Sequence, residues 1–231
     1  MSVFLKERTI TMIGSTHREL GHCTADALVS LFSMISPDVI FEELPPSLLD
    51  TYYKSKNASN LESMVIERYT EIYGVPHFPV DTDDMPTESF KRSFEMLDQR
   101  IRGLDNGFGD RYRKALAVKN ANRAIGGFPY LNSEYFERDK DLIDRTFEIG
   151  LGMLCDDHLN ECYASWQALN ERRELEMIEN IGRHCTESHF RNAVFTIGAA
   201  HRKSILDKVE SSRFVERFDV RWVPVEQLRC F

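Results

Sequence analysis

Residues 12–18 read Met-Ile-Gly-Ser-Thr-His-Arg, and residues 196–202 read Thr-Ile-Gly-Ala-Ala-His-Arg. Each stretch ends a short β-rich run and begins a helical pattern, with a glycine that permits the tight turn between them. Ligands bind outside the carboxyl ends of the strands in open α/β sheets. The near-repeat therefore predicts a fold in which His17 and His201 face one cleft, although they lie near opposite ends of the chain.

The periodicity around these two motifs predicts an α/β scaffold. Strands are expected at 9–13, 38–41, 77–81, 193–197 and 214–223, and helices within 20–35, at 61–72 and after residue 201. Because strands and helices alternate along the chain, crossovers of the kind found in parallel sheets are expected to join the strands. We expect one central sheet, mixed or parallel, built from two βα-containing halves.

The middle of the chain has a different pattern. Long polar helical stretches are expected at 88–104, 111–124, 133–150 and 166–182, with glycine-rich breaks at 106–109 and 126–129. We therefore expect one domain with an N-terminal α/β half at 1–85, a mainly α-helical insertion at 86–190 that covers the cleft, and a C-terminal α/β half at 191–231. The aromatic side chains of the insertion are expected to pack its helices, and a lid hinged at the glycine-rich breaks is the alternative.

Composition and charge exclude several classes of protein. The chain has 231 residues, of which 42% are hydrophobic, and its net charge of −8 does not supply the cations that sequence-independent nucleic-acid binding requires. It contains no apolar run of about 18 residues that could span a bilayer, and its first residues contain no apolar signal segment. The five cysteines have no Cys-x-x-Cys spacing, which favours a reducing compartment. We therefore expect a cytoplasmic protein that binds neither nucleic acid nor membrane.

Acidic residues follow two of the other predicted strands. Glu42 and Glu43 end the second strand, and Asp81 ends the third. With His17 and His201 they would place two imidazoles and a carboxylate at one edge of the sheet, which suits a divalent metal ion or acid–base chemistry. For Glu43 a solvated acid before a proline turn is equally consistent with the sequence, and for Asp81 a simple turn is the favoured interpretation.

Other polar groups carry weaker signals. Arg18 and Arg202 each follow a site histidine, and helix-surface arginines are the favoured interpretation, with carboxylate or phosphate binding as the alternative. The Cys and His residues within 155–162 and 184–189 do not have the spacing of a closed four-ligand zinc site.

Five short motifs occur in a fixed order along the chain. They are Ile13–His17, Pro37–Leu44, Pro79–Asp81, Glu171–Met177 and Ile197–His201. This ordered set resembles the TraB/GumN/TIKI superfamily, a broad group that includes the erythromycin esterases and the ChaN-type haem-binding lipoproteins. The Glu-Leu pair of the family pattern selects Glu43 over Glu42, and the arginine motif places the family arginine at Arg173.

The resemblance implies a metal-dependent hydrolase that cleaves a peptide or ester bond of a small-molecule or peptide substrate. His17, Glu43 and His201 would hold a divalent ion or its water, Asp81 would add a ligand or orient a histidine, and Arg173 would stabilise oxyanion charge. A module that binds haem or a metal without turnover, or a regulatory interaction protein on the same scaffold, is the alternative. The sequence leaves the metal, the substrate and the oligomeric state open.

The spacing around Arg173 adds a separate expectation. Arg173 and Met177 are four residues apart, so a helix places them on one face, and burial of Met177 would hold Arg173 at the inner edge. An unpaired buried charge is costly, so the guanidinium would need Glu43, Asp81 or a substrate oxyanion as its partner. Arg173→Lys is then expected to lower kcat and kcat/KM together with little change in stability. The alternative is that Arg173 is solvated.

Overall fold

The computed structural model describes residues 8–54, 60–105 and 107–228, without the side chain of Val215. Residues 1–7, which contribute to the expectation about a signal segment, lie outside this part of the chain. The described strands form one five-stranded sheet in the order β3-β2-β4-β1-β5, and every pairing is parallel. The strands are β1 (Arg8–Ser15), β2 (Val39–Glu42), β3 (His77–Pro79), β4 (Asn192–Gly198) and β5 (Val220–Pro224). The predicted α/β class is confirmed, and the sheet is parallel rather than mixed.

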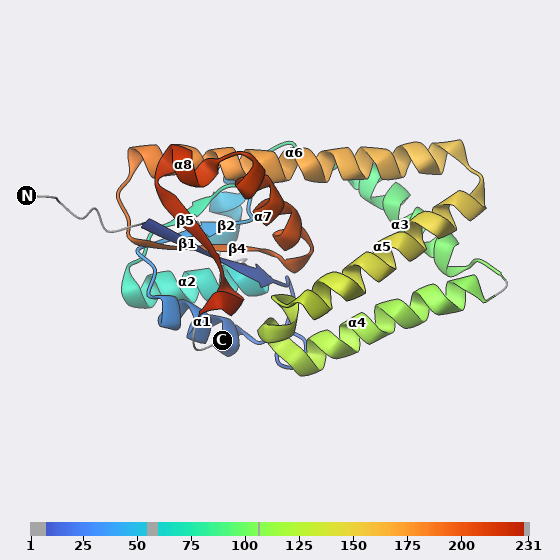
Figure 1. The fold of residues 1–231 in the computed structure, drawn as a ribbon, viewed down its shortest axis with the longest axis horizontal. Coiled ribbons are helices and arrows are strands. Elements are labelled where there is room, and N and C mark those ends of the chain that lie inside the picture. Colours follow the sequence, from blue (N-terminus) through green and yellow to red (C-terminus); the bar gives the residue numbers. More distant parts are fainter. Residues whose placement is uncertain (1–7, 55–59, 106, 229–231) are drawn as a thin grey trace, which may run out of the picture.

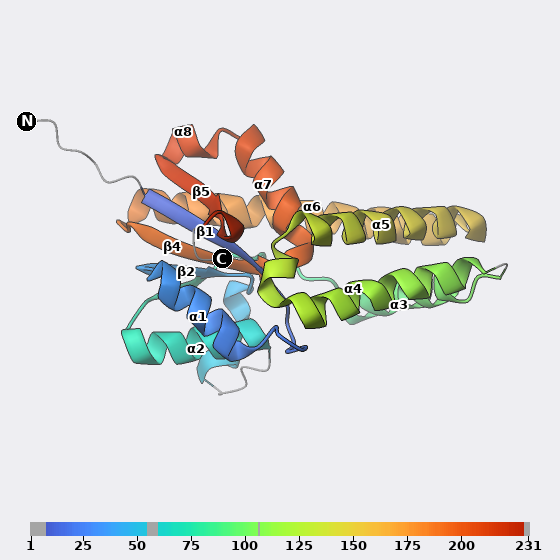
Figure 2. The ribbon, with the colours of Figure 1, turned by 60° about the horizontal axis from the view of Figure 1, so that its bottom comes forward.

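Helices cover both faces of the sheet. On one face lie α1 (Ala25–Ile35) and α2 (Leu61–Tyr73), and on the other lie α7 (Arg202–Ser211), α8 (Phe214–Phe218) and one end of α6 (Asp157–Glu187), as Figure 2 shows. Strands buried on both faces are apolar at successive positions. In β2, Phe41 packs in the cluster beneath α6 and α7, whereas its neighbour Ile40 packs in the cluster beneath α1 and α2. Because successive side chains of a strand point to opposite faces, each strand contributes to the hydrophobic clusters on both faces of the sheet.

Capping residues set the ends of the helices on the first face. The Thr24 hydroxyl accepts a hydrogen bond from the N–H of Ala27 at 3.2 Å, so α1 starts later than the apolar stripe suggested, and Leu20 lies in the preceding loop. Asn60 caps α2 in the same way through the N–H of Ser63 at 2.7 Å. Gly74 ends α2 in the left-handed conformation with φ of 68°, which confirms the expected C-cap.

The predicted helical insertion is confirmed. Between β3 and β4 lie α3 (Glu88–Arg102), α4 (Phe108–Leu131), α5 (Glu134–Leu154) and α6. Figure 1 shows that the first three helices and half of α6 project as an arm beyond the sheet, and that the other half of α6 packs on it. The arm has its own hydrophobic cluster, which includes Leu97, Ile101 and Phe147. The long helix α6 therefore joins the arm to the sheet.

The expected break at 126–129 is confirmed as a sharp bend at Gly127, with φ of 59° and ψ of −148°, between two helical parts of α4. One local prediction needs correction. The first half of the expected last strand is the helix α8, and only β5 is extended. Helical spacing brings the rings of Phe214 and Phe218 to 4.5 Å from each other, and both pack on Gly182 of α6, where a Cβ atom would lie 2.7 Å from Phe218. A strand would also place both rings on one face, but about 13 Å apart, so the two rings could not touch each other and share the space beside Gly182.

Most aromatic side chains of the insertion pack its helices, as expected. Phe108, Tyr112 and Phe128 are buried, whereas Tyr135 is 70% exposed. Among the described residues, no helix is both long enough and apolar enough to cross a membrane.

Candidate functional site

The two Gly-x-x-His segments leave neighbouring strands at the same level. β1 and β4 pair in the register Ser15–Gly198, so His17 and His201 follow the two strand ends by two and three residues. Glu43 follows β2, on the far side of β4, and Asp81 follows β3 at the sheet edge. The carboxyl edge of the sheet thus carries all four strand-end residues selected from the sequence.

Arg173 of α6 lies between the two acids. Its Nη2 donates to Glu43 Oε1 at 2.7 Å and to Asp81 Oδ2 at 2.6 Å, and its Nε donates to Asp81 Oδ1 at 3.2 Å. The three side chains are 11%, 10% and 1% exposed. Burial alone would lower the pKa of Arg173, but the hydrogen bond to Asp81 and the charge of Glu43 raise it. The guanidinium has both of the carboxylate partners that the sequence suggested, and it is not solvated.

Glu43 also links Arg173 to the second Gly-x-x-His segment. Its Oε2 accepts the backbone N–H of Gly198 at 2.7 Å, and its Oε1 lies 3.9 Å from His201 Nε2. A Cβ atom at position 198 would lie 3.3 Å from Glu43 Oε2, so glycine gives the carboxylate room. Glu42 points elsewhere, because its oxygens bind Tyr53 and His77 at 2.5 Å each. The choice of Glu43 over Glu42 therefore matches the geometry.

His201 is held by a carboxylate that the sequence analysis did not select. Its Nδ1 lies 2.6 Å from Oε1 of Glu174. The Oε2 atom of Glu174 accepts hydrogen bonds from Ser204 Oγ at 2.5 Å and from Lys208 Nζ at 2.9 Å. Burial would raise the pKa of Glu174, but hydrogen bonds from His201, Ser204 and Lys208 outweigh it and lower that pKa. An ionised Glu174 requires a proton on Nδ1, so the Nε2 atom of the neutral imidazole carries the free lone pair.

His17 has a second, similar partner. Its Nδ1 lies 3.3 Å from Oε1 and 3.4 Å from Oε2 of Glu62, and Ser15 Oγ donates to the same carboxylate at 2.5 Å. The hydrogen bond with Glu62 raises the pKa of His17; the charge of Glu43 also raises it, and that of Arg173 opposes it. These interactions place His17 within electrostatic range of the Glu43–Arg173 pair. The His17 side chain is 64% exposed, against 16% for His201, so the two imidazoles differ in environment.

The raised pKa of His17 gives a prediction about pH. Below its folded pKa, which lies above the ordinary value of 6.5, His17 is charged, and it loses this charge as pH rises through that pKa. We expect Glu62→Gln to lower the pKa of His17, because the amide removes the negative partner. An NMR titration of the His17 ring measures this shift, with Glu71→Gln on the exposed face of α2 as the control. An unchanged titration in Glu62→Gln would contradict the pairing.

The two arginines that follow the histidines differ. Arg18 is exposed, in line with the favoured interpretation of a surface arginine. For Arg202 that interpretation is wrong: its side chain is 7% exposed and forms ion pairs with Glu137 of α5 at 3.0 Å and with Glu226. Because these acids come from the arm and from the end of the chain, Arg202 joins three parts of the fold.

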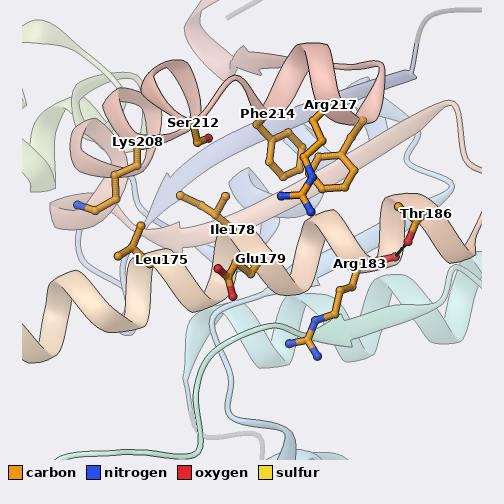
Figure 3. Close-up of a pocket in the computed structure, with 10 residues that line it drawn as sticks. Leu175, Ile178, Glu179, Arg183, Thr186, Lys208, Ser212, Phe214 and Arg217 are labelled. Atoms are coloured by element: carbon orange, nitrogen blue, oxygen red, sulfur yellow. Dashed lines mark hydrogen bonds between the residues drawn. The ribbon is translucent and has the colours of Figure 1, made fainter.

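Several cavities lie along α6, and Lys208 lines two of them. One of about 500 Å³ lies between α6, α7 and the arm, and His201, Glu174 and Lys208 are part of its lining. The other, of about 420 Å³, lies between α6, α7 and α8 (Figure 3) and contains none of the residues of the site except Lys208. Figure 3 shows the Lys208 ammonium directed away from the other side chains of this second cavity. Of these two cavities, only the first is lined by His201.

The donor set of the predicted metal site suits an ion only in part. His17 and His201 each hold a carboxylate at Nδ1, which is how metal-ligating histidines are usually oriented, with Nε2 left for the metal. Glu43 and Asp81, in contrast, bind Arg173. Within the part of the chain that the structure describes, no three His, Cys, Asp or Glu side chains group closely enough to hold a metal ion. The predicted four-residue ligand set does not fit an ion while Arg173 holds both carboxylates.

Comparison of the chain with protein-family models, with curated proteins and with solved structures finds no match. The resemblance to the TraB/GumN/TIKI superfamily therefore stays a prediction.

Proposed function

We propose that this protein is a hydrolase that cleaves an ester or amide bond of a small molecule or peptide, with His201 as the general base. The observation that carries the proposal is the contact of 2.6 Å between His201 Nδ1 and the ionised Glu174, beside a cavity of about 500 Å³. A neutral imidazole held in this way presents Nε2 as a base. The resemblance stated above supplies the reaction class. We also propose that the protein is cytoplasmic.

The proposed reaction uses one water molecule. His201 Nε2 takes a proton from the water while the water oxygen forms a bond to the substrate carbonyl carbon, which gives a tetrahedral oxyanion and an imidazolium. Glu174 keeps the imidazole oriented and stabilises its positive charge. The bond from carbon to the leaving oxygen or nitrogen then breaks, and the leaving group takes the proton from Nε2. The products are the carboxylic acid and the alcohol or amine.

The other residues of the site have supporting roles in this proposal. His17, whose pKa is raised by its hydrogen bond with Glu62, would donate a hydrogen bond to the developing oxyanion when it is protonated. Arg173 holds the Glu43 side chain in place, and the Glu43 carboxylate, 3.9 Å from Nε2, stabilises the imidazolium as it forms. The role proposed from the sequence for Arg173, direct oxyanion binding, becomes secondary because its Nε and Nη2 atoms bind Asp81 and Glu43.

A substrate panel tests the reaction class. Purified protein is assayed against aryl esters, aryl amides and short peptides that differ in charge and in the size of the acyl group. The proposal expects saturable turnover of at least one ester or amide above the rate of a His201→Ala preparation made in the same way. Turnover that is equal in both preparations would contradict it.

A metal-dependent form of the same hydrolase is the second candidate. The orientation of His17 and His201, each with a carboxylate at Nδ1, favours it. In that case a divalent ion would polarise the carbonyl or lower the pKa of its bound water.

Metal content measures this candidate directly. If the two histidines hold an ion, the wild-type protein binds about one equivalent of a divalent metal, and His17→Ala lowers this by about tenfold or more in affinity. Arg18→Ala, at the next exposed position, is the matched control. Wild-type protein with no affinity for divalent ions, or unchanged content in His17→Ala, would contradict a metal role for His17.

Binding without turnover is the remaining alternative. A Soret band that appears on haem titration and is lost in His17→Ala would favour a haem-binding module over the hydrolase. A regulatory interaction protein on the same scaffold would have neither the band nor the turnover.

A further inference from the structure

One face of α6 forms a continuous wall of the cavity beside His201. Tyr163, Trp166, Asn170 and Glu174 line it at spacings of three to four residues, which places them on one side of the helix, and Glu171 lines it next to Asn170. From Trp166 to Glu174 the helix rises by about 12 Å, at about 1.5 Å for each residue. The cavity is therefore elongated along α6, and its chemistry changes from one end to the other.

The end in the arm is aromatic. Trp166 stacks on Phe94 of α3, with ring centroids 4.4 Å apart and an interplanar angle of 22°. Tyr163 packs against Phe147 of α5 with centroids 5.1 Å apart. All four rings line the cavity. This end fits an aromatic or other flat apolar group.

The middle of the wall offers a hydrogen-bond acceptor without a donor. Asn170 lies one helical turn from Glu174, and its Oδ1 atom is buried with no hydrogen-bond partner among the described residues. A buried polar atom without a partner is costly, and native structures contain few of them. A ligand that carries an N–H or O–H group at this level would satisfy Asn170.

The charges of the lining favour a cation over an anion. Both lysines of the cavity are paired, Lys140 with Asp144 at 2.5 Å and Lys208 with Glu174 at 2.9 Å. The acid next to Asn170, Glu171, has no ion pair within the described part of the chain. Both lysines that could pair with an anionic group already form ion pairs. An ammonium group could instead contact the Glu171 carboxylate and the Asn170 oxygen, which lie next to each other along α6.

We propose that this cavity binds an elongated substrate whose aromatic tail lies on Trp166 and whose ammonium group lies at Asn170 and Glu171. The bond to be cleaved then lies beyond the ammonium group, at His201, and this last part rests on the proposed hydrolase function. The order tail, ammonium, carbonyl follows the order of Trp166, Asn170 and Glu174 along the helix.

Tryptophan fluorescence tests the binding without any turnover. The chain has two tryptophans, and the other, Trp222 of β5, is 9% exposed and packs on Phe195 and Phe214. Three probes share one aromatic tail and differ in the terminal group: 4-phenylbutylamine, 4-phenylbutan-1-ol and 4-phenylbutyrate. The proposal expects a saturable change in emission with the amine, weaker binding of the alcohol, and binding of the carboxylate about tenfold or more weaker than that of the amine. The change in emission is expected to be lost in Trp166→Phe.

Variants of Asn170 locate the ammonium group. Asn170→Leu is expected to weaken the binding of 4-phenylbutylamine by about tenfold. Asn170→Asp, which adds a negative charge at the same place, is expected to tighten that binding. Asn160→Leu, at an exposed position of the same helix, should leave the dissociation constant unchanged. A carboxylate probe that binds as tightly as the amine, no saturable change with any probe, or equal affinities in the Asn170 variants would overturn the proposal.

The two proposals fail in different ways. Amine binding that depends on Asn170, in a protein that hydrolyses no ester or amide, would support this cavity and contradict the hydrolase. Hydrolysis that depends on His201, in a protein that does not bind the amine, would overturn the cavity proposal and leave the hydrolase.

Discussion

The His201→Ala variant is expected to hydrolyse the best ester substrate about 10²- to 10⁴-fold more slowly than the wild-type protein, the range typical for loss of a positioned general base. The imidazole is 16% exposed, Glu174 fixes its Nδ1, and it lines the cavity beside the sheet edge. No other histidine has this combination among the described residues, since His17 is 64% exposed and His77 binds Glu42 away from the site. The loss should appear in kcat, because the base acts in the chemical step.

A matched variant separates this effect from a general loss of histidine. His158 lies at an exposed position of α6, in the arm, so His158→Ala should retain the wild-type kcat. Circular dichroism and the midpoint of urea unfolding establish that both variants are folded. A His201→Ala protein that is folded and keeps the wild-type kcat would contradict the role of His201.

The Arg173→Ala variant is expected to lose about 3–5 kcal/mol of unfolding free energy, as measured for buried ion pairs when one partner is removed. Removal of the guanidinium leaves Glu43 and Asp81 with no cation, and their side chains are 10% and 1% exposed. Two carboxylates in one buried place repel each other, and they lose the hydrogen bonds that Arg173 donates. Urea unfolding measures the loss.

Arg172 provides the matched control for this prediction. Its side chain is 66% exposed and its contact with Asp84 at 3.2 Å is a surface ion pair, so Arg172→Ala should change stability by no more than about 1 kcal/mol. Equal losses in Arg172→Ala and Arg173→Ala would contradict the buried network. The geometry also changes the expectation for Arg173→Lys. A lysine cannot reproduce the three hydrogen bonds to Asp81 and Glu43, so a stability loss of about 1–3 kcal/mol accompanies any loss of activity.

The fold could be predicted from the sequence where periodicity and breakers agree. β1 and β4 are short β-rich runs with a glycine at or next to their ends, and α2 has an apolar stripe, an Asn cap and a terminal Gly74. The sequence failed where one pattern fits two structures. Residues 214–223 partly alternate apolar and polar side chains as a strand would, but Phe214 and Phe218 also fit one face of a helix that packs on Gly182.

The candidate site could be predicted in part for a related reason. His17, Glu43, Asp81 and His201 lie within one to three residues of a strand end, and parallel strands bring their carboxyl ends together whatever the side chains are. Glu62 and Glu174 come from helices. Which side of a helix faces the sheet depends on packing that a single sequence does not specify, and Glu174 is one of three acids within 171–176. The only local signal for it was its position next to Arg173.

The most direct test of the general-base assignment is rescue of His201→Ala by free imidazole. The variant leaves space beside Glu174 at the wall of a cavity of about 500 Å³, which imidazole can reach from the substrate side. Hydrolysis of the best ester is measured in the variant as imidazole is added, with the imidazole-catalysed rate without protein subtracted. If His201 is the general base, the rate rises in a saturable way toward that of the wild type, and Glu174→Gln in the same background removes the effect. Hydrolysis by His201→Ala at the wild-type rate without imidazole would contradict the assignment.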